Sequence, residues 1–189
     1  MRTALSRSLA PTVRLPDDTS TRRIEALHEL AWRDLLDLQP GTTQALIDRA
    51  ASQLGLAAVG LAAGARVGFH GACGSDLFVV CDTCSCDRAV IEVKGPGARM
   101  NLGKTSWQTD LYRDAYRSRD SVQGCPCVQP PTPLFILLDA QNRTREEIER
   151  KEGANWPLSL SGWAVLTYGE VLSNAPFAGQ PLADWLLGY

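Results

Sequence analysis

The sequence has no long apolar run. A helix that crosses a bilayer needs about 18 or more consecutive apolar residues, and no such stretch occurs among the 189 residues. The longest candidate, residues 54–65, is short and rich in glycine and alanine, which favours a buried turn and helix end. We therefore expect no membrane span.

A large excess of charge of one sign is also absent. The formal net charge is -2, which excludes a polycation that binds nucleic acid through bulk charge. Any such affinity has to come from a local basic surface and from metal bridging to phosphate. The hydrophobic content of 44% and the charged content of 21% are ordinary for a soluble globular protein.

No secretory signal, internal repeat or low-complexity tract is evident. Residues 1–14 contain arginine and serine but no acid, as in organelle transit peptides. A frayed terminus of a cytoplasmic protein explains them equally simply, and we favour that interpretation. We predict a flexible N-terminal segment over residues 1–20 and a single domain over residues 21–189.

What the chain does contain is a predicted β-hairpin over residues 74–94. Asp76 opens an apolar run, a polar turn with cysteines follows, and a second run ends with Glu92 and Lys94. The start of one antiparallel strand lies beside the end of the other, so the three side chains meet at the open end. Glu92 and Lys94 share one face. Asp76 joins them if its partner is an even-numbered residue, and points away if the register slips by one.

Two carboxylates and an ammonium at one place suggest metal chemistry. Neighbouring carboxylates repel each other unless a cation lies between them, and their oxygens are ligands for Mg²⁺. A lysine beside them can orient or deprotonate a metal-activated water, or neutralise charge on a phosphate. The plain alternative is a hairpin with three solvated charges at its open end, because a D…ExK string is common.

A helix-like segment over residues 105–119 follows the turn at 95–97. Gln108 and Tyr112 are one helical turn apart there, and therefore lie on one face. Basic residues such as Lys104 and Arg113 alternate with aromatic ones. This pattern suits contact with a nucleic-acid strand, in which basic groups bind the phosphates and aromatic rings stack on the bases. The alternative is that the aromatic rings pack on the sheet while the arginines face water.

At these positions the sequence resembles the PD-(D/E)XK nuclease superfamily, in particular its RecB-like branch. The matching parts are Asp76, the Glu92-Val93-Lys94 triplet and the Gln108…Tyr112 pair, with Ser75 in place of the proline. The resemblance covers residues 66–140. It implies an α/β fold with a restriction-endonuclease-like mixed β-sheet of about five strands flanked by α-helices.

The resemblance also implies roles for these residues. Asp76, Glu92 and the backbone carbonyl of Val93 would hold Mg²⁺ (or Mn²⁺), while Lys94 would position the attacking water. Gln108 would fix Lys94 or a phosphate, and Tyr112, Lys104 and Arg113 would contact the nucleic acid.

An acid or histidine on the first helix often completes the metal site in this superfamily. Here the predicted helix runs from Ser20 or Thr21 to about Leu38. We assign Glu29 to the ion, with His28 and Glu25 as alternatives. A solvated helix face explains all three equally well.

The cysteines suggest a second site. Five of them fall into two clusters, at residues 81–86 and 125–127: Cys81, Cys84, Cys86, Cys125 and Cys127. A helical crossover would make the apolar run 134–138 parallel to the second hairpin strand, so both clusters should meet at the end away from Asp76. Five thiols suffice for a tetrahedral structural Zn²⁺ site. Free thiols, disulfides and an iron–sulfur cluster remain alternatives.

The other elements follow from pattern. A second helix capped by Thr42 or Thr43, a first strand over 66–70 and a charged helix or loop over 142–152 are expected. The runs 134–138 and 163–168 are predicted to be strands, with a short apolar tail from 171 onward.

These features together predict a metal-dependent deoxyribonuclease that hydrolyses phosphodiester bonds. DNA is the expected partner, and a homodimer is expected if both strands are cut. The alternative is a catalytically inactive PD-(D/E)XK-fold module that binds nucleic acid or protein and is stabilised by structural zinc, since fold does not settle function.

Overall fold

The computed structural model describes residues 21–39, 41–57, 64–69, 74–82, 85, 87–98, 110–111, 133–152, 160 and 162–188. The helices and strands follow one another in the order α2 (Thr21–Leu38), α3 (Thr42–Gln53), β1 (Ala65–Phe69), β2 (Leu77–Cys81), β3 (Asp87–Lys94), β4 (Leu134–Asp139), α5 (Arg145–Glu152), β5 (Trp163–Thr167), α6 (Tyr168–Leu172) and α7 (Pro181–Leu187). Within these ranges no helix combines the length and the apolar character that a membrane crossing requires.

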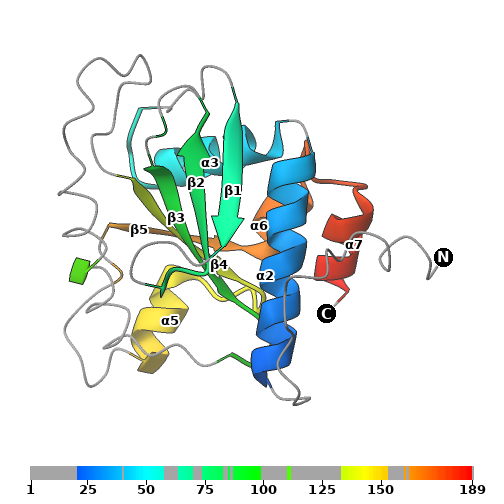
Figure 1. The fold of residues 1–189 in the computed structure, drawn as a ribbon. Coiled ribbons are helices and arrows are strands. Elements are labelled where there is room, and N and C mark those ends of the chain that lie inside the picture. The colour runs from blue at the N-terminus through cyan, green and yellow to red at the C-terminus, as the bar shows by residue number, and fades with distance from the viewer. Residues whose placement is uncertain are drawn as a thin grey trace.

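The strands form one five-stranded mixed sheet in the order β1-β2-β3-β4-β5 (Figure 1). The pairs β1–β2 and β2–β3 are antiparallel, whereas the pairs β3–β4 and β4–β5 are parallel. The short connection from β2 to β3 allows an antiparallel pair, and the long connections before β4 and β5 allow parallel crossovers. The predicted α/β class, the mixed sheet of five strands and the flanking helices are confirmed.

The sheet is covered on both faces. Ala89, Ile91 and Val93 of β3 pack in one cluster with α2, α3, α6 and α7. Val90, from the opposite face of the same strand, packs in a second cluster with Ile148 of α5. This explains why residues 134–138 of β4 and 89–91 of β3 are continuous apolar runs, since both sets of alternating side chains are buried.

The junction of α2 and α3 differs from the predicted cap. Gly41, with a φ of 81°, occupies the N-cap position of α3, and Thr42 is already helical. The hydroxyls of the two threonines point back to α2 instead. Thr42 Oγ1 donates to the Leu35 carbonyl at 2.8 Å and Thr43 Oγ1 donates to the Leu36 carbonyl at 2.6 Å. The two hydroxyls therefore donate to carbonyls at the end of α2. The helix ends there, so no further helical turn supplies N–H donors to these carbonyls.

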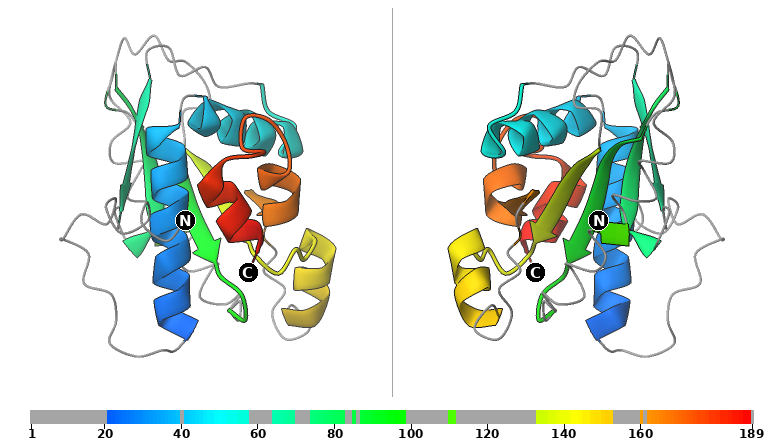
Figure 2. Two further views of the ribbon diagram at one scale, coloured as in Figure 1. Left: turned by 90° about the vertical axis from the view of Figure 1, so that its right-hand side faces the viewer. Right: turned by 90° about the vertical axis from the view of Figure 1, so that its left-hand side faces the viewer.

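The chain after β5 is helical rather than an apolar tail. The predicted strand ends at Thr167, one residue early, because the Thr167 side chain and Glu170 form a capping box that starts α6 at Tyr168. Helix α7 then lies beside α2, although the two stand at opposite ends of the described chain (Figure 2). Both helices contribute to the larger of the two clusters.

Candidate active site

The hairpin of β2 and β3 has the register that brings its charged residues together. Leu77 pairs with Ile91, and the same register carried one residue further places Asp76 opposite Glu92. The register shift in this pair lies between Val79 and Val80, away from the open end. Asp76 therefore has the even-numbered partner that its convergence with Glu92 and Lys94 requires.

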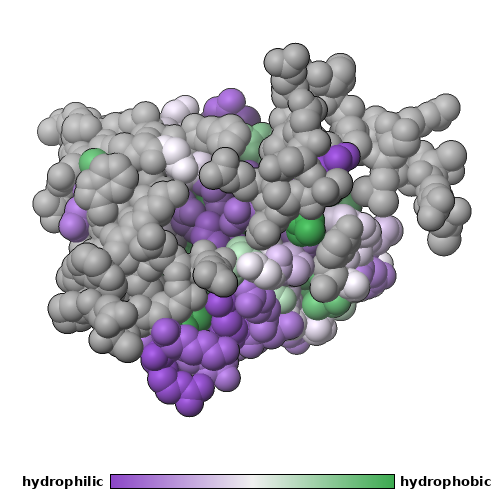
Figure 3. All heavy atoms as spheres, turned by 90° about the horizontal axis from the view of Figure 1, so that it is seen from below, coloured by the Kyte–Doolittle hydropathy of each residue, from purple (hydrophilic) through white to green (hydrophobic). Residues whose placement is uncertain are grey.

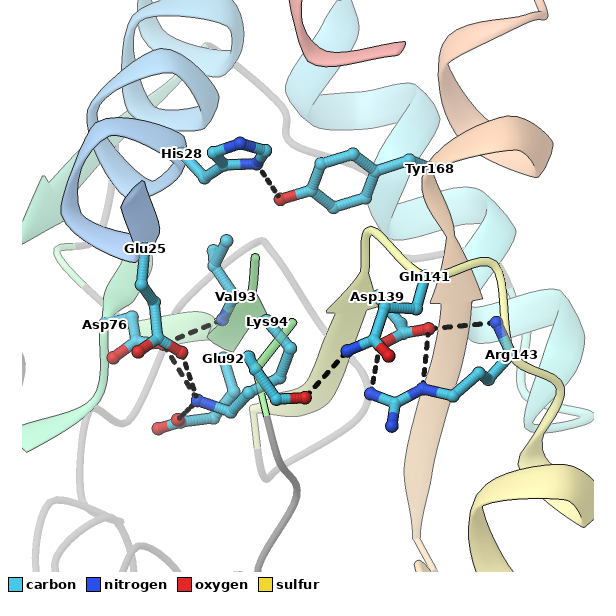
Figure 4. A network of polar contacts seen from close by, with 11 residues as sticks. Glu25, His28, Asp76, Glu92, Val93, Lys94, Asp139, Gln141, Arg143 and Tyr168 are labelled. Carbon is cyan, nitrogen blue, oxygen red and sulfur yellow. Dashed lines mark hydrogen bonds and ion pairs between the residues drawn. The ribbon is translucent and has the colours of Figure 1, made fainter. Parts of the chain in front are cut away.

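The ammonium of Lys94 lies within ion-pair distance of three carboxylates (Figure 4). Its Nζ lies 3.2 Å from Glu25 Oε1, 3.4 Å from Glu92 Oε2 and 3.7 Å from Asp76 Oδ2. The Glu92 side chain is only 5% exposed and that of Lys94 is 19% exposed. The four charges thus lie in a recessed site in which water screens them incompletely.

Asp76 is fixed by the backbone of the neighbouring strand. The Val93 N–H donates to Asp76 Oδ2 at 2.8 Å. The Val93 side chain belongs to the core on the other face, so only its backbone can serve the site.

The pKa values of the site residues reflect burial and the close approach of several charges. Burial and the Glu92 carboxylate raise the pKa of Asp76, against the opposing effects of Lys94 and the Val93 N–H. Burial, Asp76 and Glu25 raise the pKa of Glu29 to about 8. Burial disfavours the ammonium form of Lys94, but the surrounding carboxylates outweigh it and raise the Lys94 pKa. Lys94 is therefore a cation at neutral pH.

The donor set fits a hard divalent cation. No three His, Cys, Asp or Glu side chains in the described part of the chain already converge closely enough to hold an ion. The available donors are nevertheless carboxylate and carbonyl oxygens, which Mg²⁺ and Mn²⁺ prefer. Burial first, and neighbouring carboxylates second, raise the pKa values of Asp76 and Glu29, and a bound cation would relieve the repulsion between these carboxylates.

Helix α2 brings two acids to the site and turns its histidine away. Glu25 contacts Lys94, and Glu29 interacts electrostatically with Asp76 and Lys94. His28 is fully buried on another side of α2, where its Nδ1 lies 3.1 Å from the Tyr168 hydroxyl. The His28 alternative for the ion is therefore wrong, because one residue step turns a helix by about 100°.

Strand β4 adds an ion pair that the sequence analysis missed. Asp139 is fully buried and lies opposite Lys94 in the register of the parallel strands β3 and β4. Its ion-pair partner is Arg143. Its carboxylate accepts from the Arg143 backbone N–H at 2.9 Å and from Arg143 Nη2 at 2.7 Å. The sequence feature that could have predicted Asp139 is an acid at the carboxyl end of a buried parallel strand, where the sites of α/β proteins commonly lie.

The turns that follow β3 and β4 are joined beside this ion pair. The Ala140 N–H donates to the Lys94 carbonyl at 2.9 Å, and Gln141 Nε2 donates to the Ala98 carbonyl at 2.7 Å. The end of β3 is thus held in place on the β4 side. From below, the end toward which β3 and β4 run, strongly hydrophilic residues gather on part of the coloured surface (Figure 3).

Several predicted residues lie outside the described residues. They are Gln108, Tyr112, Lys104 and Arg113 on the expected helix, and Cys84, Cys86, Cys125 and Cys127 of the expected zinc site. Cys81 is described: it is fully buried at the end of β2 far from Asp76, as the hairpin direction predicted.

Comparisons with protein-family models, with curated proteins and with solved structures found no match to this chain.

Proposed function

We propose that this chain is a metal-dependent nuclease of the PD-(D/E)XK superfamily that hydrolyses phosphodiester bonds in DNA. The observation that carries the proposal is the meeting of Asp76, Glu92 and Lys94 at the open end of one hairpin. The superfamily resemblance requires this meeting, and a register slip of one residue would have prevented it.

The surrounding structure supports the same function. An antiparallel hairpin beside parallel strands is the arrangement expected of a restriction-endonuclease-like fold. Ser75 occupies the position of the superfamily's proline, and its buried Oγ has no hydrogen-bond partner. An apolar side chain would fit there, so the departure from the motif is a mild one.

Each residue has a definite part in the mechanism. Asp76, Glu92 and the Val93 carbonyl would hold the ion, and Glu29 lies close enough to influence it. A divalent ion supplies activation of the attacking water and stabilisation of charge that develops on the phosphate. Lys94, being protonated, acts as a hydrogen-bond donor that orients the water and neutralises phosphate charge. The attack is in line, with the leaving oxygen opposite the incoming one.

The test is the Lys94→Ala variant assayed with plasmid and with linear DNA in Mg²⁺. We expect cleavage to be abolished while circular dichroism and thermal unfolding show a folded protein. Lys151→Ala, which removes an exposed lysine of α5, is the matched control and should cleave normally. Full activity of Lys94→Ala would contradict the mechanism. A wild-type chain that binds DNA but never cleaves it would favour the inactive binding module instead.

The proposed zinc site is tested separately. Metal analysis of protein purified without chelator should find about one zinc per chain, and Cys84→Ser combined with Cys86→Ser, which leaves three of the five thiols, should remove it. The absence of zinc in the wild-type protein would exclude a structural role for that metal, without consequence for the nuclease site.

A further inference from the structure

The carboxylate nearest to the Lys94 ammonium belongs to α2 rather than to the hairpin. Glu25 lies at 3.2 Å, closer than Glu92 at 3.4 Å and Asp76 at 3.7 Å. Glu25 precedes Lys94 by 69 positions in the chain, so only the packing of α2 against the sheet brings the two together. Among the described residues, the Lys94 ammonium therefore has a partner outside the D…ExK motif.

The close packing of α2 on the end of β3 is visible in the backbone as well. Gly95 directly follows Lys94, and a Cβ at Gly95 would lie 3.4 Å from the Glu25 Cα. The end of β3 thus approaches the α2 backbone at Glu25 itself. This approach fixes the distance over which the Glu25 side chain reaches Lys94.

The position of the ammonium matters because it competes with a divalent ion. Both cations are attracted to Asp76 and Glu92, and an ammonium directly between these two acids would repel the ion. An ammonium held to one side keeps the two acids accessible and still lies near the attacked phosphate.

We propose that Glu25 is a positioning residue for Lys94, which holds the ammonium on the α2 side of the site so that Asp76 and Glu92 can take the ion. The inference rests on the proposed metal-dependent function. It differs from a direct ligand role for Glu25, because Glu25 acts here only through Lys94.

The experiment is a double-mutant cycle on Mn²⁺ binding to the full chain, measured by electron paramagnetic resonance and calorimetry. We expect Glu25→Gln to weaken Mn²⁺ binding about ten-fold, because Lys94 then stays with Asp76 and Glu92. Lys94→Met should strengthen binding about ten-fold. In the Lys94→Met background, Glu25→Gln should change the affinity by no more than about three-fold.

Glu25→Asp is the charge-matched variant. It keeps the carboxylate but shortens the reach by one methylene, so we expect it to weaken Mn²⁺ binding nearly as much as Glu25→Gln does. Thermal unfolding verifies that each variant is folded, and Lys94→Gln replaces Lys94→Met if the latter is not.

Four results would overturn the inference. An equal loss from Glu25→Gln in both backgrounds would make Glu25 a ligand, and wild-type affinity of Glu25→Asp would reduce its role to charge alone. Mg²⁺-dependent cleavage by the wild-type chain, combined with unchanged Mn²⁺ binding in the Glu25 variants, would leave the proposed function intact. If neither the wild type nor Lys94→Met binds Mn²⁺, the metal site fails, and the proposed function fails with it.

Discussion

Burial and neighbouring carboxylates make the ionised form of Glu29, on α2, unfavourable in the native state. Burial, Asp76 and Glu25 raise its pKa to about 8 from an ordinary value of 4.5. The folded protein therefore holds this proton more tightly than the unfolded chain does. Stability consequently falls as the pH rises from 4.5 to 8.

The Glu29→Gln variant removes this dependence. In metal-free buffer, we expect it to be about 1 to 3 kcal/mol more stable than the wild type above pH 8 and no more stable below pH 4.5. This stability difference is smaller than the free energy that corresponds to the full pKa shift of Glu29, because the side chain is partly exposed and water screens its charge. Urea unfolding across this pH range measures the difference, and a pH-independent difference would contradict the prediction.

His28 has the opposite dependence. Burial lowers its pKa from 6.5 to about 4, so the native state keeps it neutral while the unfolded chain takes up a proton. Stability should be lost between pH 6.5 and pH 4, by up to about 3 kcal/mol. His28→Asn keeps a polar atom near the Tyr168 hydroxyl but does not titrate. The unfolding free energy of this variant should therefore not show the loss that His28 protonation causes in acid, even if the variant is less stable than the wild type at neutral pH.

At the scale of the elements, the outer edge of β5 is protected by side chains. The Gln53 amide at the end of α3 donates to the Val165 carbonyl at 2.8 Å and accepts from the Val165 N–H at 2.7 Å. Glu170 accepts from the Thr167 N–H at 2.9 Å, and Arg145 donates to the Trp163 carbonyl. An edge strand whose polar groups are occupied resists pairing with another chain. If two copies of the chain associate, we therefore expect them to use a different surface.

Gln53→Ala should expose this edge. Two hydrogen bonds are lost, which we expect to lower the unfolding free energy by about 1 to 2 kcal/mol and to promote concentration-dependent association. Gln44→Ala on the same helix is the control, because the Gln44 Nε2 donates to Asp48 Oδ1 within α3. Denaturant unfolding and light scattering measure both effects. Equal behaviour of the two variants would show that the edge needs no such protection.

At the scale of the whole molecule, the proposed ion would lie where α2, near the N-terminal end of the described sequence, meets the β2–β3 hairpin from its middle. The ligands would converge only in the folded state, so the ion would bind the folded chain and stabilise it by mass action. At a concentration about 100 times its Kd, Mg²⁺ should add about 2.7 kcal/mol. For a protein of this size that corresponds to a rise in Tm of about 5 to 10 °C.

Asp76→Asn should remove the response of Tm to Mg²⁺. The substitution also relieves repulsion from Glu92, so the metal-free variant should be at least as stable as the metal-free wild type. Differential scanning calorimetry with and without Mg²⁺ measures both quantities. An undiminished rise in the variant would place the ion elsewhere.

Local pattern made much of this fold predictable. The hairpin, the parallel β4 strand and the α2 helix follow from apolar periodicity, turn composition and the length of connections. The convergence of Asp76 with Glu92 and Lys94 was predictable up to one choice of register. The cap of α3 and the helices α6 and α7 were missed because Gly41 and the Thr167–Glu170 box act through backbone geometry that residue patterns represent poorly.

The sequence by itself determined which charged residues stand at the ends of adjacent strands, because strand alternation and chain direction are local properties. Only the tertiary structure decided that Glu25 rather than His28 meets Lys94, and that Asp139 with Arg143 lies next to them. These contacts depend on how α2 is rotated against the sheet and on which strands become neighbours. Both are set by burial of apolar surface over the whole core, which no short stretch of sequence encodes.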